Sequence, residues 1–300
     1  MRAMVLAAGL GTRLRPLTLE RPKPGVPYGL APLACVSLEA LAAVGVREVV
    51  MNTHHLGERL PGLLEPHLPA GMSVRYLHEE TLLGTGGGVA NAAGWLREAD
   101  GPVLLLNSDI VFRPDLGAAL ETHRRLGARA TMVLRPDPAA ERLGAIDVDP
   151  DGRVRRLLGE PAWAGETARF MFTGVHVLSA DALDDMPPEG CIVRHAYRRW
   201  VDDPETVVAG VVDEGPWRDL GTLAAYLGAQ VELARAEGGA LVHPSAEVDP
   251  AAELDGCVVG AGARIGPVRL ARCVVWPGAR VIESLEDAVV TPERVVTVGA

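Results

Sequence analysis

The sequence predicts an α/β protein with a mostly parallel sheet flanked by helices, followed by a short C-terminal β domain. Two observations predict this fold class. Short apolar runs alternate with helix-like segments through residues 1–236, the pattern of strands joined by crossover helices. Beyond residue 239 this alternation gives way to near-repeats that begin at Leu241, Val258, Val274 and Val289, at offsets of 17, 16 and 15 residues. We therefore expect a first domain over residues 1–236 and a second over residues 240–300.

Each expected element follows from the length of its apolar run and from the turn residues beside it. Short apolar runs bounded by Gly, Pro, Asn or Asp predict buried strands, and longer runs predict helices. On this basis strands are expected at residues 2–8, 46–52, 74–78, 103–110 and 207–212. Helices are expected at residues 33–43, at residues 223–236 and directly after a glycine cluster at residues 84–88.

The C-terminal repeats indicate stacked coils that share one core. Aliphatic residues recur at inward positions, and Pro or Gly occupies the corners between them. The pattern resembles a left-handed parallel β-helix of about three shortened coils. An uncapped coil end exposes apolar surface and unpaired backbone, so we expect this domain to pack subunits into a homo-oligomer and to carry no catalytic residues.

Composition argues against several classes of function. Hydrophobic residues make up 48% of the chain and charged residues 23%, and no apolar run approaches the roughly 20 residues of a membrane span. The chain opens on a strand-like run rather than on a leader, so we expect a cytoplasmic protein that binds no membrane. A net charge of −10 without a basic stripe argues against nucleic acid. The cysteines lack paired spacing and are expected to be small buried residues rather than disulfides or zinc ligands: Cys35, Cys191, Cys257 and Cys273.

The first glycine-rich segment concentrates positive charge. Lys23 is the only lysine, since 28 of the 29 basic residues are arginine, and it lies between two prolines soon after Gly9 and Gly11. An ammonium group is a compact charge that can approach one phosphate oxygen, whereas guanidinium is a broad fork. Glycines let consecutive N–H groups converge on an anion. Codon bias could leave a single lysine, but the local excess of cations in an acidic chain predicts a bound polyphosphate: Arg13, Arg15, Arg21 and Lys23.

Two other phosphate-binding motifs do not fit this segment. A dinucleotide fingerprint needs a third glycine where Leu14 stands, and an acidic residue after the second strand, which ends at Asn52. A P-loop needs glycine directly before its lysine, and Lys23 follows a proline.

Three further features are open to two interpretations each. The glycine cluster at residues 84–88 indicates either close approach to a planar or anionic group, or a flexible loop. Asp109 ends the apolar run that starts at residue 103, and the carboxyl end of a strand in an open α/β sheet borders ligand sites. Asp219 stands between an apolar run and an expected helix. Each aspartate is either a metal ligand or an ordinary loop cap, and spacing does not pair them.

The opening motif of the sugar-1-phosphate nucleotidyltransferases, also called nucleoside-diphosphate-sugar pyrophosphorylases, is closely similar to two stretches of this chain: Leu6-Ala7-Ala8-Gly9-Leu10-Gly11-Thr12-Arg13-Leu14-Arg15-Pro16-Leu17-Thr18 and Arg21-Pro22-Lys23-Pro24. The resemblance implies a Rossmann-like fold and catalysis with Mg²⁺. It assigns catalysis to Arg13, Lys23 and Asp109. It assigns metal binding to Asp109 and Asp219, although Ser108 replaces the glycine usual before the first aspartate. It implies nucleotide contacts from both glycine segments: Leu6, Ala7, Ala8, Gly9, Gly11, Thr12, Arg13, Gly84, Thr85 and Gly86.

The same resemblance places the sugar phosphate near the middle of the chain. Residues 142–154 predict a hairpin in which Gly144 is similar to the family's sugar-facing glycine. Glu160 is similar to the glutamate of a Glu-Lys-Pro motif, but Pro161 follows it directly and the lysine is absent. Either a nearby arginine such as Arg169 replaces that lysine, or this branch manages without it. Thr173 lies in a run that resembles the next sugar-contacting strand, although its alternation also fits plain core β structure.

The resemblance implies attack of a sugar 1-phosphate on the α-phosphorus of a nucleoside triphosphate, with loss of pyrophosphate. His78-Glu79-Glu80 resembles the mannose-1-phosphate guanylyltransferase branch, so GTP and mannose 1-phosphate are the expected substrates and GDP-mannose the expected product. One alternative is UTP or dTTP with the 1-phosphate of N-acetylmuramic acid, glucose, N-acetylglucosamine or heptose. The other is a catalytically silent sugar-nucleotide-binding subunit, which would have no charge requirement to keep Arg13, Lys23, Asp109 and Asp219 together.

Overall fold

The computed structural model describes residues 1–138, 140 and 144–299, which fall into two compact units. The first unit comprises Met1–Gly9, Val36–Gly57 and Leu68–Trp217, and the second comprises Leu10–Cys35, Glu58–His67 and Arg218–Ala300. These units do not follow the expected boundary near residue 236, because the segment with Lys23 groups with the C-terminal region. Arg142 and Leu143 of the expected hairpin, and Ala300 of the expected second domain, lie outside the described residues.

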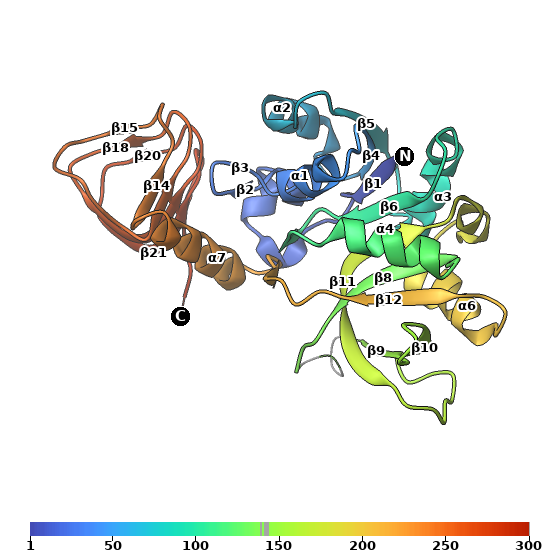
Figure 1. Ribbon diagram of the computed structural model, residues 1–300. Helices are drawn as coiled ribbons and strands as arrows, with labels where there is room; N and C mark the ends of the chain where they lie inside the picture. The colour runs from blue at the N-terminus through green and yellow to red at the C-terminus, as the bar shows by residue number, and fades with distance from the viewer. Residues whose placement is uncertain (139, 141–143, 300) are drawn as a thin grey trace. The chain divides into compact units, whose positions relative to one another are not determined.

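A nine-stranded mixed sheet forms the centre of the first unit (Figure 1). Seven strands follow the order β10, β9, β11, β6, β1, β4, β5, while β8 pairs with both β11 and β12. The pairs β6–β1, β1–β4, β4–β5 and β8–β12 are parallel. The long strand β11 is antiparallel to β6, β8 and β9, and β10 is antiparallel to β9. The bounds are β1 Ala3–Leu6, β4 Glu48–Thr53, β5 Ser73–His78, β6 Val103–Asn107, β8 Ala130–Arg135, β9 Ala145–Val148, β10 Val154–Leu157, β11 Ala168–Leu178 and β12 Val208–Val212.

The register of the parallel strands brings their carboxyl ends to one edge. Leu6 at the end of β1 is in register with Asn52 of β4 and Asn107 of β6. The central strands are almost wholly buried, which explains why the sequence gives them continuous apolar runs rather than an alternating pattern. The predicted α/β class with a mostly parallel central sheet is confirmed, and the hairpin expected near residues 142–154 is the antiparallel pair β9 and β10.

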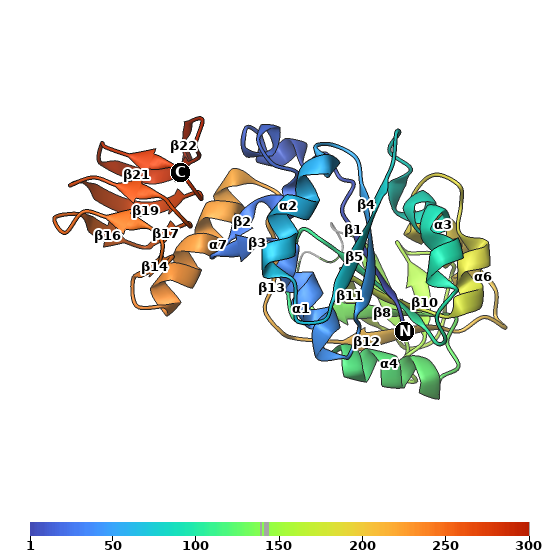
Figure 2. The ribbon, with the colours of Figure 1, turned by 90° about the horizontal axis from the view of Figure 1, so that it is seen from above.

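Helices cover both faces of this sheet. In Figure 2, α1 (Cys35–Ala43) and α3 (Gly84–Leu96) lie on opposite sides of β1 and β4. α4 (Leu116–Arg125) packs on β8 and β12, and α6 (Arg198–Asp202) packs on β10. Within the described residues no helix combines the length and apolar character needed to cross a membrane.

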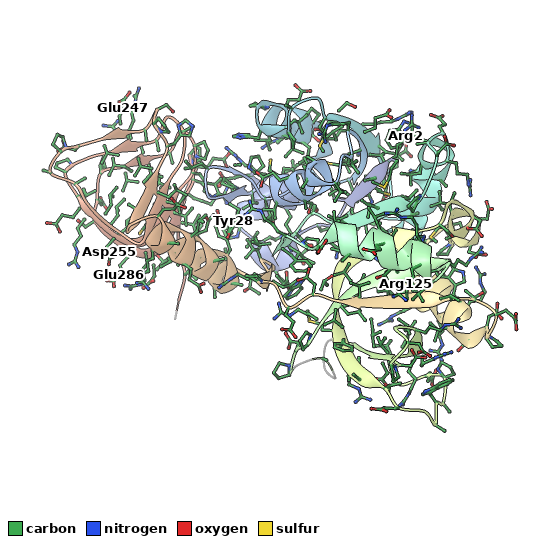
Figure 3. The ribbon with its side chains drawn as sticks, in the orientation of Figure 1. Arg2, Tyr28, Arg125, Glu247, Asp255 and Glu286 are labelled. Atoms are coloured by element: carbon green, nitrogen blue, oxygen red, sulfur yellow. The ribbon has the colours of Figure 1, made fainter. Side chains whose placement is uncertain are left out.

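The amino end of β1 is fixed by charge. Arg2, labelled in Figure 3, donates to Glu98 at 2.7 Å and to Glu48 at 3.2 Å, and its guanidinium carbon lies 4.2 Å from the centroid of the Trp95 ring. β7 (Ile110–Phe112) follows β6 after a two-residue turn, and β13 (Trp217–Asp219) leads from the first unit into the second.

The second unit begins with three short 3₁₀ turns at Thr12–Leu14, Leu17–Leu19 and Lys23–Gly25. The hairpin of β2 (Pro27–Tyr28) and β3 (Ala31–Pro32) follows, and α2 spans Leu60–Leu64. α7 (Leu223–Ala236) has the predicted bounds and starts where the Thr222 hydroxyl accepts the Ala225 N–H at 3.2 Å. Its fully buried Gln230 accepts from Gly29 N at 2.8 Å and donates to Pro27 O at 2.7 Å, which joins the helix to that hairpin.

The C-terminal strands form two sheets built from parallel ladders. Ala240 pairs with Cys257, Val258 with Val274, and Val274 with Val289, so the predicted offsets of 17, 16 and 15 residues are confirmed as strand register. The strands are β14 Ala240–Val242, β15 Glu247–Val248, β16 Glu253–Asp255, β17 Cys257–Val259, β18 Arg264–Ile265, β19 Arg269–Val275, β20 Arg280–Val281, β21 Leu285–Val290 and β22 Val295–Thr297.

The expected fourth repeat at residues 289–296 keeps the predicted register only as far as Val290. β22 turns back and pairs antiparallel with β21, placing Val295 against Val290, because a tight turn joins Thr291 N to Arg294 O at 2.9 Å. The ladders enclose an apolar core that includes Cys257 and Cys273. These two cysteines and Cys35 are buried, as predicted, whereas Cys191 is only half-buried.

Candidate active site

The carboxyl ends of three neighbouring strands are tied together in the first unit. Leu6 O accepts from the backbone N–H of Ser108 at 3.1 Å and from its hydroxyl at 2.6 Å. Ala7 N donates to Asn52 Oδ1 at 2.9 Å. The hydroxyl of Ser108, a residue that replaces the usual glycine, therefore holds the carboxyl end of β1. The N–H of Ala7 is engaged by Asn52, so the expected contacts of backbone N–H groups with an anion fall to the residues after Ala7.

Glu79 links this edge of the sheet to the second glycine cluster. Its side chain is buried, and its Oε1 accepts from Asn52 Nδ2 at 2.8 Å while its Oε2 accepts from Leu83 N at 3.2 Å. A Cβ at Gly88 would lie 2.8 Å from Asn52 Nδ2 and 3.0 Å from Glu79 Oε1, so only glycine leaves room for this network. A single carboxylate thus connects both segments that were predicted to contact the nucleotide.

The second glycine cluster forms the first turns of α3, and the flexible-loop interpretation is wrong. Gly84 has a φ of +75°, and a Cβ there would lie 2.7 Å from a carbonyl oxygen of the segment at residues 187–192. Gly86 donates its N–H to the same carbonyl at 2.8 Å, and the Thr85 hydroxyl accepts from Ile192 N at 2.9 Å. The glycines are therefore required, at least in part, by close approach to another segment of the chain itself.

Three predicted residues converge in the second unit. Arg13 Nη2 lies 3.4 Å from Asp219 Oδ2, and Lys23 Nζ lies 3.8 Å from Asp219 Oδ1. The Arg13 side chain is 65% exposed, but the Lys23 side chain is only 8% exposed. An exposed ion pair adds little to folding stability. Two cations around one carboxylate leave an excess of positive charge, which suits the binding of an anion.

Two glycines make room for this cluster. Gly11 has a φ of +59°, and a Cβ there would lie 3.1 Å from Lys23 Cβ. A Cβ at Gly221 would lie 2.6 Å from Arg13 Nη2 and 2.9 Å from Asp219 Oδ1. Larger residues at either position would displace the charged groups.

The other cations of the first segment do not join the cluster. The guanidinium carbon of Arg21 lies 5.2 Å from the centroid of the Trp276 ring, and burial lowers the pKa of Arg21. Arg15 is exposed, as is Thr12, which opens the first 3₁₀ turn. The cations that predicted a polyphosphate site thus have different surroundings. Arg13 and Lys23 lie at Asp219, whereas Arg21 packs on Trp276.

Asp109 lies between β6 and β7 in the first unit, whereas Asp219 belongs to the second, so their pairing stays a prediction. The described part of the chain holds no group of three or more His, Cys, Asp or Glu side chains arranged for a metal. Mg²⁺ is commonly held by one or two carboxylates together with substrate phosphates, so two aspartates are a donor set that fits its chemistry.

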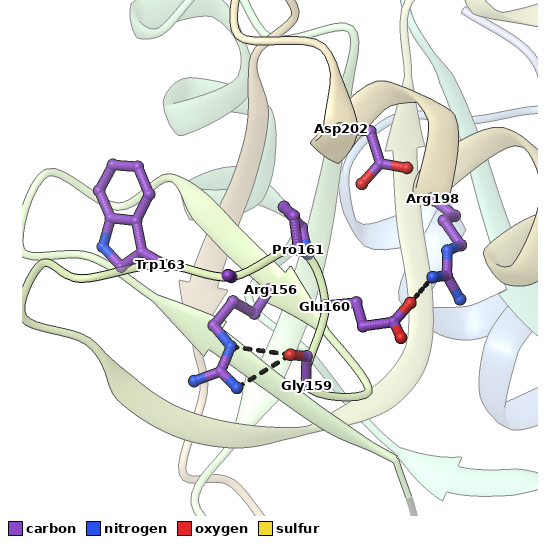
Figure 4. Close-up of a pocket in the computed structure, with 8 residues that line it drawn as sticks. Arg156, Gly159, Glu160, Pro161, Trp163, Arg198 and Asp202 are labelled. Atoms are coloured by element: carbon purple, nitrogen blue, oxygen red, sulfur yellow. Dashed lines mark hydrogen bonds and ion pairs between the residues drawn. The ribbon is translucent and has the colours of Figure 1, made fainter.

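A cavity of about 580 Å³ lies beside Glu160 in the first unit (Figure 4). The Glu160 carboxylate forms an ion pair with Arg198 of α6, and Arg156 donates to Gly159 O at 2.9 and 3.1 Å. Trp163 also lines the cavity, and its side chain is partly exposed. Two guanidinium groups, a carboxylate and an aromatic ring are groups that can hold a phosphorylated sugar.

The other residues predicted for the sugar end lie in or beside the sheet. Arg169 donates to both carboxylate oxygens of buried Asp147, at 2.8 and 3.3 Å, and this pairing engages the cation that was the candidate for the missing lysine. Thr173 is fully buried and its hydroxyl donates to Val133 O at 2.7 Å, as the core-strand interpretation expects. Gly144, with a φ of +110°, immediately precedes β9.

Sequence reasoning missed four residues, three in the first unit and one in the second: Asn52, Glu79, Arg198 and Gly221. Asn52 is a polar residue at the carboxyl end of an apolar run, a feature that could have indicated it. Glu79 stood inside a motif that was noted, and Gly221 lies two residues after Asp219, but the roles of both depend on contacts with residues distant in the sequence. Arg198 had no signal in the sequence.

Comparisons with known proteins agree with one another. A family model described as "Nucleotidyl transferase" matches residues 2–236. The chain is 34% identical to a mannose-1-phosphate guanylyltransferase of Mycobacterium tuberculosis, over 93% of this chain and 80% of that protein. It is 30% identical to a probable mannose-1-phosphate guanylyltransferase 1 of Oryza sativa subsp. japonica, over 94% and 82%.

Solved structures share the fold. The crystal structure of HddC from Yersinia pseudotuberculosis complexed with GMP-PN superposes with a TM-score of 0.62 at 22% identity, covering 77% of this chain and 99% of that one. A second crystal structure of the same protein gives a TM-score of 0.61.

Proposed function

Because this chain belongs to the sugar-1-phosphate nucleotidyltransferase family, we propose that it transfers GMP from GTP to mannose 1-phosphate, giving GDP-mannose and pyrophosphate. The observation that carries this proposal is the cluster of Arg13, Lys23 and Asp219. The choice of GTP and mannose 1-phosphate rests on the names of the relatives from Mycobacterium tuberculosis and Oryza sativa.

The chemistry requires charge neutralisation more than proton transfer. A phosphate oxygen of mannose 1-phosphate attacks the α-phosphorus of GTP, and the bond to the β-phosphate oxygen breaks as pyrophosphate leaves. The attacking phosphate is already ionised, so no general base is needed. Arg13 and Lys23 stabilise negative charge that builds on the departing pyrophosphate and around the α-phosphorus. Burial of Lys23 fixes its ammonium, so little reorganisation accompanies the reaction.

We assign the metal to Asp109 and Asp219 and take it to be Mg²⁺. When bound, it would supply positive charge that neutralises part of the negative charge on the phosphates. Asp219 also holds Arg13 and Lys23, so the same carboxylate orients the cations that meet the phosphates.

The nucleotide is assigned to the two glycine segments. The first segment starts at Leu6, the last residue of β1, and continues through Ala7, Ala8 and Gly9 to Gly11, Thr12 and Arg13. In the second, Gly84, Thr85 and Gly86 open α3, whose amino end carries partial positive charge. Glu79 keeps both segments in place through Asn52 and Leu83.

The sugar phosphate is assigned to the cavity beside Glu160. Gly144, which precedes β9, and Thr173 of β11 are assigned to it as well. Thr173 contributes as part of β11, since its hydroxyl is engaged by Val133. Arg198 rather than Arg169 takes the place of the absent lysine, because it pairs with Glu160 in the cavity wall. Arg198→Ala should raise the KM for mannose 1-phosphate about tenfold with little change in the KM for GTP. Arg198→Lys should raise the KM for mannose 1-phosphate less than Arg198→Ala does. Equal effects on both KM values would contradict this assignment.

The C-terminal region is proposed to be a short left-handed parallel β-helix through which subunits form a homo-oligomer in the cytoplasm. Parallel ladders at offsets of 17, 16 and 15 residues support the coil, and Ile282, 67% exposed, supports a contact surface. Light scattering after chromatography tests it, and a monomer would contradict the oligomer.

The proposed reaction is tested by pyrophosphate release in the presence of Mg²⁺. GTP, UTP, dTTP, ATP and CTP are each combined with the 1-phosphates of mannose, glucose, N-acetylglucosamine, N-acetylmuramic acid and heptose. Strong release with only GTP and mannose 1-phosphate is the expected result. A different strong pair would keep the mechanism and replace the substrates. A folded protein that binds nucleotide but releases no pyrophosphate with any pair would be a silent subunit.

A further inference from the structure

The segment that carries Lys23 is anchored to the C-terminal strands of the same unit through Glu20. The Glu20 side chain is 6% exposed, and its Oε1 accepts from Arg294 Nε at 2.5 Å and from Thr291 Oγ1 at 2.8 Å. Thr291 and Arg294 belong to the turn between β21 and β22. The backbone oxygen of Glu20 accepts from Arg59 Nη1 at 2.6 Å. Both the side chain and the backbone of Glu20 are therefore held.

The next residue is held by the same region. The Arg21 guanidinium lies over Trp276, a fully buried residue that follows β19 directly. Trp276 Nε1 donates to Tyr226 Oη of α7 at 3.1 Å. Two consecutive residues, Glu20 and Arg21, are thus fixed by side chains that come from residues 226–294.

Only Pro22 separates this anchor from Lys23. Its φ is −60°, and the proline ring prevents that angle from changing freely. A shift of Glu20 would therefore be passed to the Lys23 backbone. The Lys23 side chain runs beside Gly11, where a Cβ would lie 3.1 Å from Lys23 Cβ, so the ammonium has little room to compensate.

We propose that Glu20 is a positioning residue for Lys23, held by Arg294 and Thr291, and that the C-terminal β region thereby contributes to catalysis. This inference rests on the proposed function for its catalytic part. Charge-assisted hydrogen bonds in a buried setting are strong and directional. Removal of the Arg294 guanidinium leaves a buried carboxylate without this cation, and the segment must move to hydrate it. The ammonium three residues later moves with it.

The position of Lys23 can be measured without any substrate. Because Lys23 is the only lysine, an amine-reactive reagent modifies this residue and the chain's amino terminus, and peptide mass spectrometry separates the two products. Arg294→Ala should raise the rate of Lys23 modification several-fold. Arg294→Lys, whose added lysine lies on a different peptide, should restore a Lys23 rate near that of the unaltered protein. An unchanged rate in Arg294→Ala would overturn the proposal.

Arg272→Ala is the matched control. The Arg272 side chain is 34% exposed, as is that of Arg294, and it pairs with Asp287 and with Glu286, which is labelled in Figure 3. The Arg272→Ala variant therefore loses an arginine–carboxylate pair within the same C-terminal strands but keeps the contact between Arg294 and Glu20. Its Lys23 modification rate should match the unaltered protein, and a rise equal to that of Arg294→Ala would overturn the proposal. If Arg294→Ala does not fold, Glu20→Gln replaces it, since the amide keeps the side-chain shape and an oxygen for Thr291.

The catalytic part is tested by a double-mutant cycle. Arg294→Ala should lower kcat about tenfold with the KM for GTP nearly unchanged, as expected when a reacting group is misplaced. In a Lys23→Ala background, Arg294→Ala should cause no further fall in kcat, because it acts through the missing ammonium. An equal fall in both backgrounds, or no fall in either, would overturn the proposal. Failure of the unaltered protein to release pyrophosphate would instead refute the proposed function, while the labelling rates would still decide the position of Lys23.

Discussion

The first glycine segment and the second glycine cluster make room for different groups. At Gly11 and at Gly221, both in the second unit, the absent Cβ leaves space for Lys23 and for Arg13 respectively. In the second cluster the space is filled by the chain itself. A Cβ at Gly86 would lie 2.6 Å from Pro187 Cγ, and one at Gly87 would lie 2.7 Å from the carbonyl oxygen of residue 188.

A run of glycines therefore does not by itself identify the group that approaches the backbone. In the first segment a substitution should disturb charged side chains with flexible ends, and therefore activity. In the second it should disturb packing between α3 and residues 187–190, and therefore stability. Each class of substitution can be tested separately.

The largest expected effect comes from the charge that the first segment accommodates. Lys23→Ala should lower kcat by about 10² to 10³ and change KM less, because the ammonium stabilises charge that develops in the transition state. Lys23→Arg should rescue poorly, since the lysine side chain is only 8% exposed and a guanidinium fork does not fit the same space. Steady-state kinetics at saturating GTP test both variants. A rise in KM with kcat unchanged would make Lys23 a simple binding contact.

Gly221→Ala should separate activity from stability. The new methyl group would lie 2.6 Å from Arg13 Nη2 and 2.9 Å from Asp219 Oδ1, and both are ends of side chains that can move aside. We expect kcat to fall by about 10- to 100-fold, because small misplacements of reacting groups are costly. The free energy of unfolding should change by about 0.5 kcal/mol or less.

Gly228→Ala in α7 is the control for Gly221→Ala. No described atom outside its own helix lies within 4 Å of the Cβ position at Gly228. Its kcat should be unchanged. If Gly221→Ala also kept full activity, the contact between Arg13 and Asp219 would have no part in the reaction.

Local patterns predicted what depends on local physics. The bounds of α7 follow from the Thr222 cap and the length of its apolar pattern, and the offsets of the C-terminal repeats became strand register. Asp109 was indicated by the rule that ligand sites border the carboxyl ends of strands. The roles of Arg13, Lys23 and Asp219 came from resemblance, because spacing in the sequence does not bring Asp219 to the two cations.

What escaped prediction depends on contacts between distant segments. Glu20 meets Arg294, which is 274 residues away, and nothing in the neighbourhood of either residue indicates the other. Arg21 was counted with the phosphate-binding cations because charge alone does not distinguish it from a residue that stacks on Trp276. The end of the fourth repeat was not predicted, because Val295 and Val296 fit the apolar pattern of a coil as well as that of an antiparallel return.

The second glycine cluster should respond in stability. Gly86→Ala places a methyl group 2.6 Å from Pro187 Cγ, and such overpacking should lower the free energy of unfolding by about 1–3 kcal/mol. At saturating GTP the kcat of the folded fraction should stay near that of the unaltered protein, whereas the KM for GTP should rise, because Gly86 is also assigned to the nucleotide. Urea denaturation and kinetics on the same samples test these statements. Unchanged stability with loss of GTP binding would show that Gly86 serves the ligand and not the packing.

The smallest effect comes from another glycine of the same helix. Gly94 lies in α3, and no described atom outside its own helix lies within 4 Å of its Cβ position. Gly94→Ala should therefore raise the free energy of unfolding by about 0.5–1 kcal/mol, because alanine loses less backbone entropy when the helix forms. The two substitutions share one helix and one chemical change. A loss of stability at Gly86 with a gain at Gly94 would therefore attribute the difference to packing against residues 187–190. A gain in the free energy of unfolding at both positions would mean that helix propensity outweighs packing against that segment.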